Sequence, residues 1–325
     1  MEMLIGRLAT AVVATVLACS AAWADWPTDK PIKMIVPFPA GGGTDYAGRL
    51  MAKHLSDKLK ANIFVENRAG ANGLVGLQAL KGSAPDGYTI ATGSDGPFIY
   101  NHGLYKERLP YDTTKDFAPI GMIMKLPAVL VIHPSVGVTT VADLIKLAKE
   151  KPGVLNYSSA GHGNFSHLSM EFFMKGAGVK MVHVPTTGTA PATLAVVQGD
   201  VQVHLNNVQT LLPLIEDKKL IALGVSEATR LKNVPNIPTI AETLPGYDMA
   251  PWVGIVAPTG TPADIVTRLS DALVDVLKDP EVIGVLEKQS LVARPMPSAE
   301  FGTFMAAEIS KWNKIIDEAG IKIGQ

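Results

Sequence analysis

The chain has 325 residues, of which 47% are hydrophobic and 18% are charged, and its formal net charge is −1. A chain of this length and composition can hold two globular domains with large cores. The near-zero charge points to no nucleic-acid or membrane-surface partner, so a bound anion would have to be attracted by local dipoles.

Residues 1–24 are predicted to be a secretory signal peptide. Arg7 supplies the positive charge, residues 8–18 are apolar, and Ala22-Trp23-Ala24 fits the small-residue cleavage pattern. The apolar run is shorter than the roughly 20 residues that span a bilayer. The single cysteine, Cys19, follows a weak lipoprotein-like motif, so lipidation is a second possibility. Cleavage after Ala24 leaves the mature protein without a thiol for disulfides, catalysis or metal binding.

A strand, a glycine turn and a helix are predicted near the start of the mature chain. Residues 34–36 form the strand, which two prolines end, and residues 41–43 form the turn. Thr44 can cap the helix, and Asp45 lies in its first turn. The free N–H groups of such a nest suit a carboxylate or phosphate. An ordinary turn of an α/β domain fits the same residues, and they match neither a dinucleotide fingerprint nor a P-loop.

Short apolar runs alternate with helical patterns along the chain, which is typical of a parallel α/β sheet. Strands are predicted at residues 34–36, 63–66, 88–91, 120–124, 129–133, 155–158, 180–184, 201–205, 220–225 and 253–257. Helices are predicted at residues 44–59, 72–81, 141–150, 190–198, 208–217, 261–278 and 298–319, with another ending near 175. Thr140 is predicted to cap one helix and Thr261 another. Residues 109–116 and 233–251 are expected to be irregular.

Three polar loops have the position expected of a ligand site. Residues 39–45, 159–166 and 185–189 each follow a strand, contain glycine and precede a helix. Ligands of open α/β sheets gather at the carboxyl ends of the strands. If the chain forms two α/β lobes, crossed by segments near residues 120–133 and 248–256, we expect these loops to face one cleft.

No catalytic or metal-binding constellation is evident. Four histidines follow one another at spacings that match no compact zinc motif: His162, His167, His183 and His204. Ser94 lacks the Gly-x-Ser-x-Gly elbow, and Ser166 cannot form a triad with the adjacent His167. We therefore expect no enzyme activity, no metal and no cofactor, with a secreted hydrolase as a distant alternative.

Several short motifs occur in a specific order along nearly the whole mature chain. They include Val36-Pro-Phe-Pro-Ala-Gly-Gly-Gly-Thr-Asp45, Glu66-Asn-Arg-Ala-Gly-Ala-Asn-Gly73, Ala84-Pro-Asp-Gly-Tyr-Thr89, Ala160-Gly-His-Gly-Asn-Phe-Ser-His-Leu168, His183-Val-Pro185 and Trp252-Val-Gly-Ile-Val-Ala-Pro258. In these motifs the chain resembles the Bug-type extracytoplasmic solute receptors of the tripartite tricarboxylate transporter family.

The resemblance implies a two-lobed α/β fold of the type II periplasmic binding proteins, without catalysis. Its lobes would comprise residues 25–125 with 249–325, and residues 126–248. A small carboxylate would be held in the cleft by backbone groups and ordered waters. Carried over to this chain, the predicted ligand-binding residues are Phe38, Ala40, Gly41, Gly42, Thr44, Asp45, Ser94, Gly163, Asn164, Ser166, Thr186, Thr187 and Asn206. Asp45 is expected to accept bonds from loop N–H groups or waters, whose other dipoles face the ligand.

The chain departs from the family pattern in its second lobe. The family usually has serine at the position of Asn164 and an aromatic-basic-glycine run at residues 186–188. It often has aspartate at the position of Asn206. These neutral groups suit a polar or singly charged ligand tail, or an aromatic acid with a polar end. The resemblance implies a monomeric periplasmic receptor that delivers its ligand to membrane subunits of a transporter. A receptor that signals to a membrane sensor is the alternative.

Overall fold

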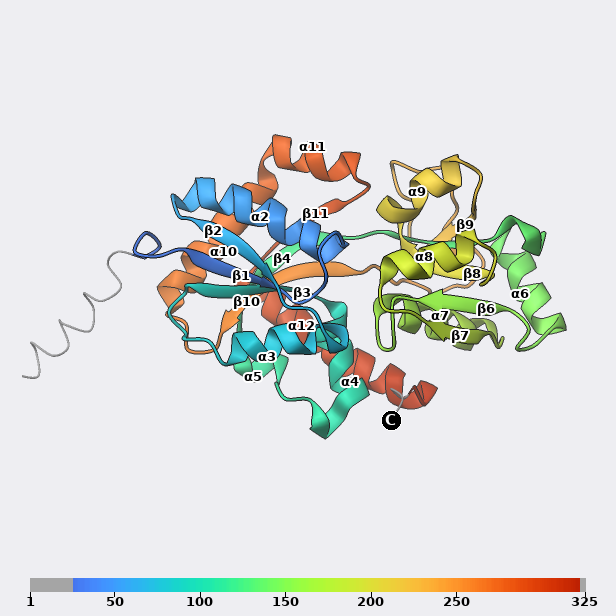
Figure 1. Ribbon diagram of the computed structural model, residues 1–325, viewed down its shortest axis with the longest axis horizontal. Helices are drawn as coiled ribbons and strands as arrows, with labels where there is room; N and C mark the ends of the chain where they lie inside the picture. The colour runs from blue at the N-terminus through green and yellow to red at the C-terminus, as the bar shows by residue number, and fades with distance from the viewer. Residues whose placement is uncertain (1–25, 322–325) are drawn as a thin grey trace, which may run out of the picture.

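The computed structural model describes residues 26–321, which form two α/β lobes side by side (Figure 1). The predicted signal peptide, its cleavage site after Ala24 and Cys19 lie outside the described residues. Within the described part of the chain, no helix has the length and apolar character needed to cross a bilayer.

The first lobe is built on a six-stranded sheet with the order β11-β4-β10-β3-β1-β2. Its strands are β1 (Ile32–Val36), β2 (Ile63–Asn67), β3 (Thr89–Ser94), β4 (Phe117–Lys125), β10 (Trp252–Pro258) and β11 (Val292–Pro297). β1 pairs in parallel with β2 and β3. β10 is antiparallel to β3 and β4 because it enters this sheet from the other lobe. The sheet is therefore mixed, and the prediction of a parallel sheet is wrong for these strands.

Seven α-helices belong to the described part of the first lobe. They are α2 (Gly43–Leu59), α3 (Leu74–Lys81), α4 (Asn101–Tyr105), α5 (Thr113–Asp116), α10 (Ala263–Lys278), α11 (Pro280–Lys288) and α12 (Ser298–Ala319). The apolar stripe of α2 is buried at Ala47, Met51 and Leu55, in one core with Met34 of β1. Helices α4, α5 and α11 and strand β11 were not predicted. α4 and α5 have five and four residues, too few for a helical period to show in the sequence.

The second lobe has a five-stranded sheet with the order β7-β6-β8-β5-β9. Its elements are β5 (Ala128–Ile132), α6 (Val141–Glu150), β6 (Asn156–Ser159), α7 (Phe165–Ala177), β7 (Val182–Pro185), α8 (Thr189–Val197), β8 (Val203–Asn207), α9 (Val208–Glu216) and β9 (Ile221–Val225). β6 is parallel to β7 and β8, whereas β5 is antiparallel to β8 and β9. The elements predicted between residues 129 and 225 are confirmed within a few residues.

Two helix caps were predicted, with different outcomes. Thr140 caps α6, because its hydroxyl accepts the N–H of Asp143 at 3.1 Å. Thr261 does not cap α10: the helix begins after Pro262, and the Thr261 hydroxyl donates instead to the carbonyl of Pro258. The proline fixes the backbone at the entry to α10, so the threonine turns back onto the preceding strand.

Two chain segments join the lobes, one between β4 and β5 and one leading into β10 (Figure 1). They are hydrogen-bonded to each other, since the N–H of Leu126 donates to the carbonyl of Pro251 at 2.8 Å. Two short segments at one edge are suited to a hinge about which lobes rotate. We propose lobe boundaries at residues 126 and 249, on these two segments.

Candidate functional site

The loop between β1 and α2 presents an uncapped helix N-terminus. Gly42 is the N-cap residue and has no side chain to accept from the first N–H groups of α2. Thr44 lies inside the first turn, so the prediction that it caps the helix is wrong. Its hydroxyl has no hydrogen-bond partner among residues 26–321. Free N–H groups and a free hydroxyl at a helix N-terminus can receive an anion.

The side chain of Asp45 holds this loop in place through hydrogen bonds. Its carboxylate accepts the N–H of Gly41 at 2.9 Å, Nε of Arg49 at 3.0 Å and Nδ2 of Asn67 at 2.8 Å. Asn67 also donates to the carbonyl of Phe38 at 3.1 Å, so both ends of the loop are held. Burial raises the pKa of Asp45, but these hydrogen bonds outweigh burial and leave the pKa below its ordinary value. The carboxylate therefore carries its charge at neutral pH.

Two members of this network were missed from the sequence. Arg49 is one helical turn beyond Asp45, a spacing that favours an ion pair on a helix and was the available signal. Asn67 lies at the end of β2, and only the parallel pairing of β1 with β2 brings it under the loop. Of the other predicted residues here, Phe38 is half-buried and Ala40 is exposed.

Ser94 ends β3, beside a buried carboxyl group. Asp95 is 4% exposed, and accepts the N–H of Gly96 at 2.9 Å and the hydroxyl of Tyr100 at 3.0 Å. Burial raises the pKa of Asp95 to about 7, and hydrogen bonds from Tyr100, Gly96 and Ser94 offset only part of this effect. The predicted site residue Asp45 is therefore a charged acid, whereas Asp95, which was not predicted as a site residue, is a buried acid with a raised pKa next to Ser94.

Asp95→Asn is expected to remove part of the pH dependence of stability. The native state keeps the Asp95 proton between about pH 4, where the unfolded chain loses it, and pH 7, so stability falls as pH rises through this window. Asparagine has the shape of the neutral acid and should raise the free energy of unfolding increasingly from pH 5 to pH 8. Urea unfolding of both proteins at each pH measures the difference, with exposed Asp57→Asn as the control. An equal effect at pH 5 and pH 8 would contradict the assignment.

The loop between β6 and α7 is organised by its own side chains. Oδ1 of Asn164 accepts the N–H and the hydroxyl of Ser166, both at 3.1 Å, which caps α7. The Ser166 hydroxyl in turn accepts the N–H of Ala160 at 3.0 Å. Gly163 has a φ of 73°, a backbone conformation that favours glycine. These predicted residues shape the loop through their mutual bonds.

Three predicted residues lie at the ends of other strands of the second lobe: Thr186 and Thr187 directly after β7, and Asn206 near the end of β8. The Thr186 hydroxyl donates to the carbonyls of Ser159 and Gly188, at 3.0 and 2.8 Å, and Thr187 is exposed. Asn206 is buried, and its Oδ1 accepts the N–H of Asn207 at 2.8 Å. Thr187 therefore offers the more accessible hydroxyl, whereas Thr186 and Asn206 brace the strand ends.

Two of the contacts between the lobes involve glycines of these loops. Nδ2 of Asn72, in the first lobe, donates to the carbonyl of Gly163 at 2.9 Å. A methyl group added at Gly163 would lie 2.5 Å from Cδ1 of Leu104. At the second place, a methyl group at Gly43 would lie 2.2 Å from Leu126 and 3.3 Å from Nδ2 of Asn207. Only glycine allows the lobes to approach this closely.

A cavity of about 570 Å³ lies between α2 of the first lobe and α9 of the second, since residues of both helices line it. Gly41, Gly42 and Asp45 line it, and so do Gln209 and Thr210 of α9. The predicted second-lobe residues do not line this cavity, and neither do Phe38, Ala40, Thr44 and Ser94 of the first lobe. Gln209 and Thr210 were not predicted from the sequence, because the pattern of an amphipathic helix does not mark which polar residues will face another lobe.

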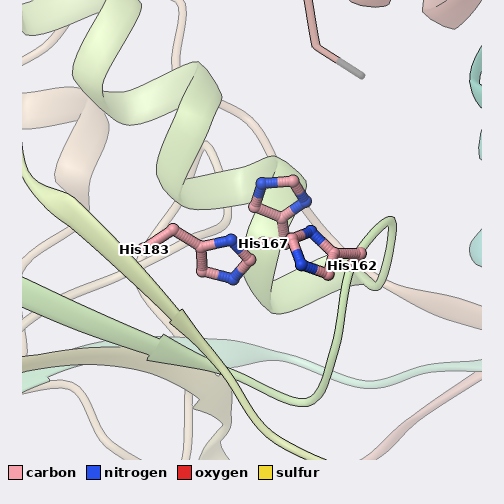
Figure 2. Close-up of side chains that lie close together, drawn as sticks. All are labelled: His162, His167 and His183. Carbon is pink, nitrogen blue, oxygen red and sulfur yellow. The ribbon is translucent and has the colours of Figure 1, made fainter. Parts of the chain in front are cut away.

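Three histidines that are separate in sequence meet in the second lobe (Figure 2). One ring nitrogen from each of His162, His167 and His183 lies within 4.8 Å of those of the other two. The rings of His167 and His183 stack at a centroid distance of 4.1 Å, and His162 meets both edge-on. The fourth, His204, is buried and bonds to Ser158 and Asn206. The pairing of β7 with β6 brings His183 close to His162 and His167, which follow β6, and sequence spacing did not indicate this proximity.

Comparison with known proteins gives one consistent family. The profile of the tripartite tricarboxylate transporter family receptor, TctC, matches residues 47–321. Protein BugT of Bordetella pertussis is 32% identical over 302 residues, which cover 92% of this chain and 92% of BugT.

Solved structures agree in sequence and in fold. The R. palustris protein Rpa4515 with adipate is 33% identical, with a TM-score of 0.86 over 92% of this chain and 100% of that one. MatC from Rhodopseudomonas palustris with bound malate is 28% identical, with a TM-score of 0.81 over 90% and 100% of the two chains. The two-lobed periplasmic binding fold implied by the motifs is thereby confirmed. The chain therefore belongs to the tripartite tricarboxylate transporter receptor family, whose members are solute-binding proteins and not enzymes.

Proposed function

We propose that this protein is a periplasmic receptor for a small organic carboxylate, which it delivers to the membrane subunits of a tripartite tricarboxylate-type transporter. The observation that carries the proposal is the uncapped N-terminus of α2, held open by Asp45 beside the cavity between the lobes. Adipate and malate in the related structures are both small dicarboxylates, which supports this ligand class.

The mechanism replaces water around the carboxylate by fixed dipoles. The N–H of Gly41 is taken by Asp45, so the N–H groups of Gly42 and Gly43 are the ones that receive the ligand carboxylate. They need no reorganisation, because Asp45 and Asn67 already hold the loop. Arg49 lies half-exposed on the wall of the cavity and adds positive charge. The second lobe closes over the ligand, and Gly43 and Gly163 allow the surfaces to meet. A monomer suffices for this cycle.

Isothermal titration with mono-, di- and aromatic carboxylates tests the ligand class. We expect at least one dicarboxylate to bind, and the sugars and cations of a control panel to give no heat. Binding of a sugar but of no carboxylate would contradict the proposal. Deleting the gene and comparing uptake with induction separates transport from the alternative role of a receptor that signals to a membrane sensor.

Thr44→Val is expected to weaken carboxylate binding about tenfold or less without loss of stability. The hydroxyl makes no bond to the described residues, so its removal costs the fold nothing, whereas one ligand hydrogen bond contributes about 0.5–1.5 kcal/mol. Titration gives the affinity, and thermal unfolding of the ligand-free protein gives the stability. Thr267→Val, an exposed threonine on α10, is the matched control. Unchanged affinity in Thr44→Val would place the ligand elsewhere.

A further inference from the structure

The three clustered histidines come from three different segments of the second lobe. His162 lies in the exposed loop after β6, His167 in the first turn of α7, and His183 in β7 (Figure 2). His162 forms ring contacts with the other two and no hydrogen bond within residues 26–321. His162 is exposed, His183 is half-buried and His167 is buried, so an ion can reach the cluster from solvent at His162.

The two inner rings are in the neutral form that binds metals. Burial, followed by the proximity of the other rings, lowers the pKa of His167 to about 3 and that of His183 to about 4. The contact of 3.8 Å between Nε2 of His167 and Oε1 of Glu171 is therefore no ion pair at neutral pH. Neutral imidazole nitrogens are preferred ligands of late first-row metal ions.

We propose that His162, His167 and His183 form a binding site for one divalent late transition-metal ion, such as Zn²⁺ or Co²⁺. Three imidazoles with one open position are a common donor set for zinc. All three ligands belong to the second lobe, whereas the glycine turn of the proposed carboxylate site belongs to the first. It goes beyond the sequence prediction of no metal, which rested on spacing alone.

Glu171 is placed to orient one of the ligands. Nδ1 of His167 accepts the N–H of Gly163 at 3.1 Å, which leaves the proton on Nε2, facing Glu171. The Glu171 carboxylate is itself held by the hydroxyl of Tyr157 at 2.5 Å. Ligation through Nδ1 keeps this tautomer, and shortening the 3.8 Å contact to a hydrogen bond would give the carboxylate–histidine–metal order typical of zinc sites. The N–H of Gly163 must turn away from His167, and His183 either ligates through Nδ1 or gives up the 2.6 Å hydrogen bond between its Nε2 and the hydroxyl of Ser159.

A small rearrangement converts the cluster into a coordination site. Zn–N distances of about 2.0–2.1 Å bring ligand nitrogens to roughly 3.3 Å from one another, and the stacked rings must rotate so that their lone pairs converge. The loop that carries His162 contains Gly161 and Gly163, with φ values of 127° and 73°. Glycine freedom in this loop allows His162 to follow the ion. Since the carbonyl of Gly163 also bonds to Asn72, the ion would act on a lobe contact.

The test uses the full mature protein without an affinity tag, after treatment with EDTA and buffer exchange. We expect one equivalent of Co²⁺ to give the visible absorption of a four- or five-coordinate ion, and Zn²⁺ to displace it. His162→Ala should weaken Zn²⁺ binding at least about tenfold, and Glu171→Gln about tenfold. His54→Ala, a histidine on α2, is the control and should bind as the unmodified protein does.

Two results would overturn the site. One is no Co²⁺ absorption in the unmodified protein, and the other is equal Zn²⁺ affinity in His162→Ala and His54→Ala. His162 is exposed, so its replacement should leave the fold intact, and circular dichroism verifies this point. His183→Asn provides a second variant. Carboxylate titration in the presence of EDTA is independent of all these results, so failure of one proposal leaves the other standing.

Discussion

Replacing Asp45 by alanine is expected to lower both carboxylate affinity and stability. The side chain is 5% exposed and accepts hydrogen bonds from Gly41, Arg49 and Asn67. Its loss removes the acceptor of these hydrogen bonds, and because Gly41 and Arg49 are exposed to water, we expect stability to fall by about 0.5–1.5 kcal/mol. The glycine turn also loses its anchor, so we expect the affinity to fall tenfold or more. Titration and urea unfolding measure the two effects.

The negative charge of Asp45 is expected to weaken carboxylate binding, whereas its hydrogen bonds to the loop strengthen it. A second variant separates these two contributions. Removing a negative charge near a bound anion favours binding, but Arg49 already neutralises much of that charge. Asp45→Asn removes the charge and retains one acceptor, so its affinity should lie between those of the unmodified protein and the alanine variant. Asp57→Ala, exposed on the same helix, is the control. An alanine variant with unchanged affinity would show that the loop does not hold the ligand.

Replacing Gly163 by alanine is expected to oppose closure of the lobes. The new methyl group would lie 2.5 Å from Cδ1 of Leu104 across the lobe contact, and the φ of 73° adds strain of roughly 1–2 kcal/mol. We expect the carboxylate affinity to fall about tenfold, which corresponds to about 1.4 kcal/mol. Small-angle scattering with saturating ligand should give a larger radius of gyration than the unmodified protein shows.

Leu104→Val in the Gly163→Ala background distinguishes the lobe contact from local strain. The shorter side chain withdraws the clashing methyl group, so affinity should recover while the strain at residue 163 and the lowered melting temperature persist. Gly284→Ala on α11 is the control, because a methyl group there meets nothing within 4 Å. Failure of the double variant to regain affinity would assign the effect to the loop conformation and not to closure.

The regular elements of the second lobe were predictable because local patterns agree with the tertiary structure. The apolar run at residues 129–133 becomes the fully buried β5, and Thr140 caps α6 as its spacing indicated. In the first lobe, α11 and β11 escaped prediction. β11 is an edge strand with mostly exposed residues, so it has no continuous apolar run to detect.

Part of the candidate site was predictable, because that part depends on residues close together in sequence. The turn at residues 41–43 combines prolines, glycines and a following helix within one short segment, so its geometry is local. Asn67 and Asn72 are ordinary loop or strand-end residues in sequence. Their roles depend on strand pairing and on the approach of the second lobe.

The sequence by itself determined the α/β class, the polar loops that follow β1, β6 and β7, and the family motifs, because these depend on neighbours a few residues apart. Only the tertiary structure decided that Asp45 holds the glycine turn and that the Thr44 hydroxyl has no hydrogen-bond partner among the described residues. It also decided that β10 runs antiparallel to its neighbours in the first sheet. It also assembled His162, His167 and His183 across strands and loops up to 21 residues apart. Such contacts arise from sheet order and lobe packing, and no local periodicity encodes them.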